Sequence, residues 1–188
     1  VLETEQYGRM LVLDGCIQTT EVDEPSYHEM LVHVPMATHP NPRRVAVVGG
    51  GDGGSIREML KHPSVEEAVL IEIDAGVVEA AKRWLPSLSS GLEDKRVQIV
   101  HTDGKEYMAK VAQGELPPFD VVVVDSTDPV KAATGLFSEA FYQTVRQALN
   151  PDGILVAQTE SPWVNQDLVT GTYQAMARTF PLARLYLS

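Results

Sequence analysis

The chain has 188 residues, which is enough for one sizeable hydrophobic core and favours one domain with a small appendage. Its 26 acidic and 15 Lys and Arg residues leave a formal charge of −11, which disfavours nucleic acid and anionic membranes as partners. Because Cys16 is the single cysteine and no apolar run reaches the roughly 20 residues that cross a bilayer, we expect a cytoplasmic protein without disulfides.

The first twenty residues alternate apolar and polar side chains around Asp14-Gly15, a dipeptide favoured in two-residue hairpin turns. We therefore predict a small β-hairpin appendage over residues 1–24. It is expected to be incomplete, since Val1 is not a natural start. A helix is predicted from Tyr27 to about Thr38, with Ser26 as its cap.

Residues 25–188 are predicted to form a Rossmann-like α/β domain, because β-rich runs alternate with helical patterns from Arg44 onward. The run Val121–Val124 is apolar throughout, as in a strand buried on both faces of a doubly wound parallel sheet. The predicted strands are 45–48, 68–73, 97–101, 119–124, 154–158 and 183–187. The predicted helices are 54–61, 75–84, 104–112, 138–149 and 166–179.

A glycine-rich turn joins the first of these strands to its helix. Gly49, Gly51 and Gly54 have the G-x-G-x-x-G spacing, which lets the backbone turn tightly and approach a nucleotide closely. Asp52 lies inside the turn, where a carboxylate would repel a pyrophosphate. The sequence therefore predicts a nucleoside ligand that carries positive charge.

One carboxylate follows each of four predicted strands. The carboxyl ends of parallel strands meet at one edge of a sheet, so these side chains are expected to converge on one cleft. They are Asp52, Glu72, Asp103 and Asp125.

Two of these carboxylates have positions typical of nucleoside binding. Glu72 follows the glycine turn by about twenty residues and suits the two ribose hydroxyls, or else it is a salt-bridged strand end. Asp103 precedes Gly104 and suits the exocyclic amine of adenine, or else it caps a helix. Asp74 is predicted to cap the helix that begins at Ala75.

Asp125 and Asp128 follow the most hydrophobic strand, in a loop stiffened by Pro129. Such a pair suits a cation held at one carboxylate and a proton accepted at the other. The alternative for Asp128 is a turn in which it bonds only its own backbone. Trp163 is interpreted either as a pocket wall or as a loop-packing residue. No bound metal is expected, because metal-ligand spacing is absent among His33, His39, His62 and His101.

Taken together, these motifs resemble those of the polyamine aminopropyltransferases, the spermidine synthase family. The resemblance implies a methyltransferase-like Rossmann fold, a homodimer or higher homo-oligomer, and no cofactor. It implies transfer of the aminopropyl group of decarboxylated S-adenosylmethionine, a co-substrate, to putrescine, giving spermidine and methylthioadenosine. It also implies that the family's C-terminal segment is missing here. The matching motifs are Tyr27-His28-Glu29-Met30, Gly49–Gly54, Glu72-Ile73-Asp74, Asp103-Gly104 and Asp125–Pro129.

The resemblance also implies a role for each site residue. On the nucleoside side, Glu72 would hold the ribose, Asp103 with Gly104 the adenine, and the glycine turn at Gly49 and Gly51 would approach the nucleoside. On the amine side, Asp52 would hold the donor's or product's amine, Asp125 would be the base and Asp128 would anchor the diamine. The substrate channel would be lined by Tyr27 and His28.

Two other functions remain open. A methyltransferase that uses intact S-adenosylmethionine would share the glycine turn, Glu72 and Asp103. It must accommodate the donor's carboxylate, however, which Asp52 and the pair Asp125 and Asp128 disfavour. A catalytically silent polyamine or nucleoside binder is the other alternative. The acceptor is also open among putrescine, cadaverine, agmatine and spermidine.

Overall fold

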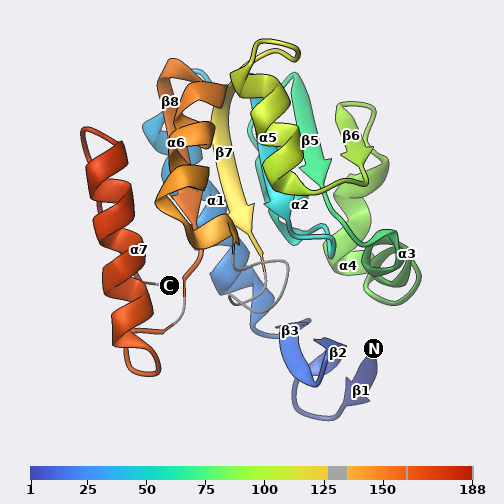
Figure 1. The fold of residues 1–188 in the computed structure, drawn as a ribbon. Helices are drawn as coiled ribbons and strands as arrows, with labels where there is room; N and C mark the ends of the chain where they lie inside the picture. Colours follow the sequence, from blue (N-terminus) through green and yellow to red (C-terminus); the bar gives the residue numbers. More distant parts are fainter. Residues whose placement is uncertain (127–134, 160, 188) are drawn as a thin grey trace.

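The computed structural model describes residues 1–126, 135–159 and 161–187. A small antiparallel sheet at the N-terminus precedes a parallel sheet that carries helices on both faces (Figure 1). The small sheet lies beyond the carboxyl ends of the parallel strands, at the bottom of the view. The predicted α/β fold with an N-terminal β appendage is therefore confirmed.

The N-terminal sheet has three antiparallel strands in the order β1-β2-β3. Asp14 and Gly15 form the predicted two-residue turn between β2 and β3, with φ of +51° and +84°. Positive φ at both turn positions matches the right-handed twist of the strands it joins. The strands are β1 (Leu2–Thr4), β2 (Gly8–Leu13) and β3 (Cys16–Thr20).

The main sheet has five parallel strands in the order β6-β5-β4-β7-β8. The chain starts in the middle at β4, moves outward to β6, and then crosses to β7 on the other side. Such a reversal is the topological switch point, beside which ligands bind in open α/β sheets. The strands are β4 (Arg44–Gly49), β5 (Glu67–Ile71), β6 (Val97–Val100), β7 (Phe119–Asp125) and β8 (Leu149–Ala157).

Helices cover both faces of this sheet because its strands are apolar on both sides. Val45 and Val47 pack into one hydrophobic cluster with α1, α2 and α3, while Ala46 and Val48 pack into the other with α5, α6 and α7. The helices are α1 (Glu24–Thr38), α2 (Gly54–Leu60), α3 (Ala75–Trp84), α4 (Pro86–Ser89), the 3₁₀ turn η1 (Ser90–Glu93), α5 (Gly104–Ala112), α6 (Glu139–Ala148) and α7 (Gln166–Thr179).

Some predicted element ends are wrong. The helix expected from Tyr27 begins at Glu24, because Pro25 needs no N–H partner in the first turn, and Ser26 donates to the Asp23 carbonyl instead of capping. Residues 183–187 form no strand, because alternation does not supply a neighbouring strand to pair with. The short helices α4 and η1 were missed, since four residues show no helical period. None of the described helices is long and apolar enough to span a membrane.

Candidate functional site

A cleft of about 570 Å³ opens at the carboxyl end of the parallel sheet, beside the switch point between β4 and β7. The four strand-end carboxylates all line it, as their positions in the sequence predict. Asp128 lies outside the described residues, and His28 lies behind the lining with 1% of its surface exposed. The predicted residues in the lining are Tyr27, Gly49, Gly51, Asp52, Glu72, Asp103, Gly104 and Asp125.

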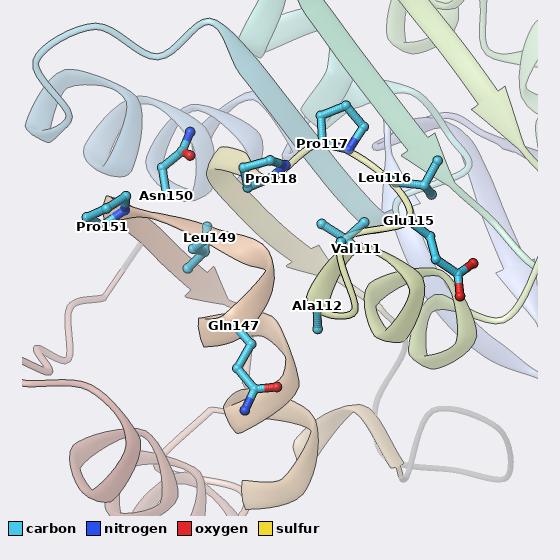
Figure 2. Close-up of a pocket in the computed structure, with 11 residues that line it drawn as sticks. Val111, Ala112, Glu115, Leu116, Pro117, Pro118, Gln147, Leu149, Asn150 and Pro151 are labelled. Atoms are coloured by element: carbon cyan, nitrogen blue, oxygen red, sulfur yellow. The ribbon is translucent and has the colours of Figure 1, made fainter.

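A second hollow, of about 620 Å³, lies near the amino ends of β7 and β8 (Figure 2). Apolar side chains make up much of its lining, among them Val111, Leu116, Pro117 and Pro118. Of the described residues that line it, Glu115 alone has an ionisable side chain. Because binding sites combine apolar walls with several convergent polar groups, the cleft at the carboxyl end is the candidate site.

The N-terminal sheet supplies one wall of the cleft, a role that its sequence did not predict. Leu11 and Leu13 of β2 and Gln18 of β3 line it together with the turn at Asp14. Leu11 also packs against the buried Val77 of α3, which docks the small sheet beside the site. The alternating apolar residues of the hairpin indicate that one of its faces is buried. They do not indicate which surface of the main domain that face covers.

The glycine turn brings β4 and α2 close to the ends of the neighbouring strands. Gly49 has a φ of +83°, and a Cβ at this position would overlap the backbone oxygen of Asp125. Inside the turn, Asp52 Oδ1 accepts a 2.7 Å hydrogen bond from the N–H of Gly54. This bond directs the carboxylate to the floor of the cleft instead of leaving it in solvent.

Replacing Gly49 by alanine is expected to destabilise the protein by about 2–5 kcal/mol. The left-handed backbone costs a side chain about 1–2 kcal/mol, and the overlap with Asp125 adds about 1–3 kcal/mol. Gly114→Ala is the matched control, since Gly114 has a φ of +78° and nothing within 4 Å of an added Cβ. Urea unfolding measures both variants, and equal losses would contradict the close approach at Gly49.

Asp125 sits at the end of β7 with both carboxylate oxygens engaged. The Tyr27 hydroxyl donates to Oδ1 at 2.6 Å, and the Ser55 hydroxyl donates to Oδ2 at 2.6 Å. Each carboxylate oxygen has a second lone pair that can still accept a proton. The two hydroxyls therefore fix the orientation of a carboxylate suited to general-base chemistry. Ser55 was missed, because its bond spans 70 residues of sequence.

Behind Asp52 and Asp125, His28 connects the cleft to the ion pair of Glu24 and Arg57. Its Nδ1 lies 2.7 Å from Glu24 Oε2, and its Nε2 lies 3.5 Å from Asp52 Oδ1 and 3.9 Å from Asp125 Oδ2. The guanidinium of Arg57 donates to both oxygens of Glu24, at 2.9 and 2.8 Å. Glu24 and Arg57 lie on different helices, and their sequence positions predicted no role for either.

Glu72 follows the end of β5 and is buried, with 9% of its surface exposed. Burial raises the pKa of its carboxyl, although backbone N–H groups of Asp74 and Gly51 oppose this. Oε1 accepts from the Asp74 N–H at 2.9 Å, and within the described ranges no Lys or Arg pairs with Glu72. Among the described residues, Glu72 therefore forms no salt bridge. Its carboxylate lines the cleft as a hydrogen-bond acceptor.

Asp103 forms the helix cap that was the alternative interpretation of this residue, and it also lines the cleft. Its Oδ1 accepts from the Lys105 N–H at 2.8 Å and so caps α5, and the same residue lines the cleft. Asp74 caps α3 as predicted, through a 2.8 Å bond from the Gly76 N–H. Neither alternative for Trp163 holds, since 82% of its surface is exposed and it is not part of the cleft lining.

Comparison with known proteins places this geometry in a family. The model of the spermine/spermidine synthase domain matches residues 24–188, and the model of the spermidine synthase tetramerisation domain matches residues 1–21. Polyamine aminopropyltransferases of Caldicellulosiruptor saccharolyticus and Moorella thermoacetica are each 54% identical over 100% of this chain. The chain spans 66% and 65% of the length of these two curated relatives.

Solved structures agree with this result. A spermidine synthase in complex with the transition-state analogue AdoDATO superimposes with a TM-score of 0.91 at 45% identity, over 96% of this chain and 60% of that one. The spermidine synthase of Thermotoga maritima gives 0.89 at 46% identity, with the same coverage of both chains. The chain therefore belongs to the spermine/spermidine synthase family.

Proposed function

We propose that this protein is an aminopropyltransferase that converts decarboxylated S-adenosylmethionine and putrescine into spermidine and methylthioadenosine. The observation that carries the proposal is the convergence of Asp52, Glu72 and Asp125 on one cleft beside the switch point. The donor carries a sulfonium and an ammonium, and a diamine is almost fully protonated near pH 7. An anionic cleft attracts both reactants and disfavours a donor that retains its carboxylate.

The nucleoside half of the donor is proposed to lie between β4, β5 and β6. Glu72 accepts hydrogen bonds from the ribose hydroxyls, while Asp103 and the N–H of Gly104 bind adenine. The backbone at Gly49 and Gly51 allows close approach. This assignment is supported by the position of all five residues in the cleft lining and by the solved family member in complex with AdoDATO.

The reaction itself is proposed to be a direct displacement. Asp52 holds the ammonium end of the donor, and Asp128, outside the described residues, anchors the far amine of the diamine. Asp125 accepts the proton of the attacking amine as its nitrogen forms a bond to the carbon beside sulfur. The C–S bond breaks, its electron pair stays on sulfur, and neutral methylthioadenosine leaves. Alignment of the two reactants supplies much of the acceleration.

We further infer that the protein is a cytoplasmic homo-oligomer assembled through its N-terminal sheet. Support comes from the match of residues 1–21 to a tetramerisation domain and from apolar side chains exposed there. Leu2 and Ile17 have 57% and 61% of their surfaces exposed. Light scattering of the purified protein measures its mass, and a monomer at micromolar concentration would refute the oligomer.

One assay tests the activity against its alternatives. The protein is incubated with putrescine and either decarboxylated or intact S-adenosylmethionine, and the products are identified by mass spectrometry. Methylthioadenosine and spermidine from the decarboxylated donor support the proposal. A methylated product from the intact donor identifies a methyltransferase, and binding without turnover identifies a silent binder. Competition of cadaverine, agmatine and spermidine with putrescine for one donor then determines the preferred acceptor.

A further inference from the structure

A line of charged side chains runs from the partly exposed Arg57 through the protein interior to the floor of the cleft. It begins at Arg57 of α2, continues through Glu24 and His28 of α1, and ends at Asp52 and Asp125. Glu24 and His28 have only 5% and 1% of their surfaces exposed, and neither is part of the cleft lining. The proposed reaction gives the inner three members no direct contact with substrate.

The contacts of His28 favour the charged imidazolium. Burial alone would lower its pKa, but the hydrogen bond that His28 donates to Glu24 and the charges of Asp52 and Asp125 raise it to about 9. Burial likewise opposes the charge of Glu24, yet the bonds from His28 and Arg57 lower the pKa of Glu24 to about 2. The groups that face His28 are Glu24 and Tyr27 of α1, Asp52 of the glycine turn, Asp125 of β7 and, through Glu24, Arg57 of α2.

The two cleft carboxylates need such a counter-charge. Burial raises the pKa of Asp52, the charge of Asp125 raises it further, and His28 opposes both. Two neighbouring carboxylates without a cation tend to share one proton, which would remove either the general base or the amine-binding group. The imidazolium of His28 lies within 4 Å of both, at 3.5 and 3.9 Å.

We propose that Glu24 and Arg57 are positioning residues, which hold a charged His28 beneath Asp52 and Asp125 so that both carboxylates stay ionised before the cationic reactants bind. This inference rests on the proposed aminopropyl transfer and adds to it the groups that prepare the base. His28 acts through these carboxylates, because it is buried behind the cleft lining. The imidazole of His28 packs closely against Gly54, since a Cβ at Gly54 would overlap the ring.

The first test is NMR titration of the histidine rings in the purified wild-type protein. His28 is expected to titrate near pH 9. In Glu24→Gln, which keeps the side-chain size and removes the charge, it is expected to titrate at least about one unit lower, a tenfold change in proton affinity. A wild-type His28 that titrates at its ordinary value overturns the proposal, whether or not the variant folds.

The second test is the pH profile of kcat/KM. In Glu24→Gln the acid limb is expected to move to higher pH. The loss should be largest between the two pH values at which His28 titrates in the variant and in the wild type, and activity should recover to within about threefold near pH 9.5, where His28 is largely neutral in both proteins. The matched control Glu29→Gln, on the exposed side of the same helix, should leave the profile unchanged. A loss of equal size at every pH would indicate a merely structural role and contradict the proposal.

The two tests also separate this inference from the activity on which it rests. Suppose that the wild-type protein shows no aminopropyl transfer, while its His28 titrates near pH 9 and titrates lower in Glu24→Gln. This result would contradict the proposed function and support the charge arrangement. An active enzyme whose His28 is neutral near pH 7 contradicts the arrangement and leaves the function standing.

Discussion

The Asp125→Asn variant is expected to lower kcat at least about 100-fold, as loss of a positioned general base does. Asparagine has the same shape, and its amide can still bond to the hydroxyls of Tyr27 and Ser55, which contact Asp125 at 2.6 Å. It cannot take the proton of the attacking amine. Donor affinity should change by less than about threefold. Methylthioadenosine formation measures kcat, and calorimetry measures donor binding.

Asp152→Asn is the matched control for this variant. Its side chain is largely exposed and lies 3.6 Å from His39, far from the cleft lining, so the same chemical change should leave turnover as in the wild type. Thermal unfolding of both variants separates loss of chemistry from loss of fold. Turnover of Asp125→Asn at the wild-type rate would remove Asp125 from the role of base.

The Glu72→Ala variant is expected to show the opposite kinetic pattern. Two charge-assisted hydrogen bonds to the ribose hydroxyls would be lost, and each contributes about 1.5–3 kcal/mol. The donor KM should therefore rise at least about 100-fold, the equivalent of roughly 2.7 kcal/mol or more, while kcat at saturation changes by less than about fivefold. Initial rates at varied donor concentration give both constants, and Glu72→Gln should fall between this variant and the wild type.

Glu79→Ala provides the comparison, because Glu79 lies exposed on the adjacent helix α3 and outside the cleft lining. Its donor KM should equal that of the wild type. If Glu72→Ala left the donor KM unchanged, ribose recognition would have to lie with other residues of the cleft. A fall in kcat with unchanged KM would instead connect Glu72 to the chemical step.

The parts of the fold that could be predicted are those in which local sequence and tertiary environment agree. The apolar run Val121–Val124 became the central part of β7, and the glycine turn after Val48 marked the start of α2. A carboxylate that follows a parallel strand must lie at the ligand edge of the sheet. For this reason the sequence alone predicts that Asp52, Glu72, Asp103 and Asp125 share one cleft.

The missed features depend on contacts between distant segments. The bond from Ser55 to Asp125 spans 70 residues, and the bonds from Arg57 to Glu24 span 33. Neither pairing leaves a periodic or compositional signal. The strand expected at 183–187 was predicted wrongly for a related reason. Alternation of apolar and polar residues describes the faces of a strand but not its hydrogen-bonding partner.

Binding of decarboxylated and intact S-adenosylmethionine, compared by calorimetry without acceptor, tests the anionic cleft most directly. The two donors differ by one carboxylate, which would approach the negative charges at Asp52 and Asp125. We expect the decarboxylated donor to bind at least about 30-fold more tightly, since unfavourable like-charge contacts cost several kcal/mol. Equal affinity, or tighter binding of the intact donor, would contradict the assignment of this cleft to a cationic nucleoside and its amine partner.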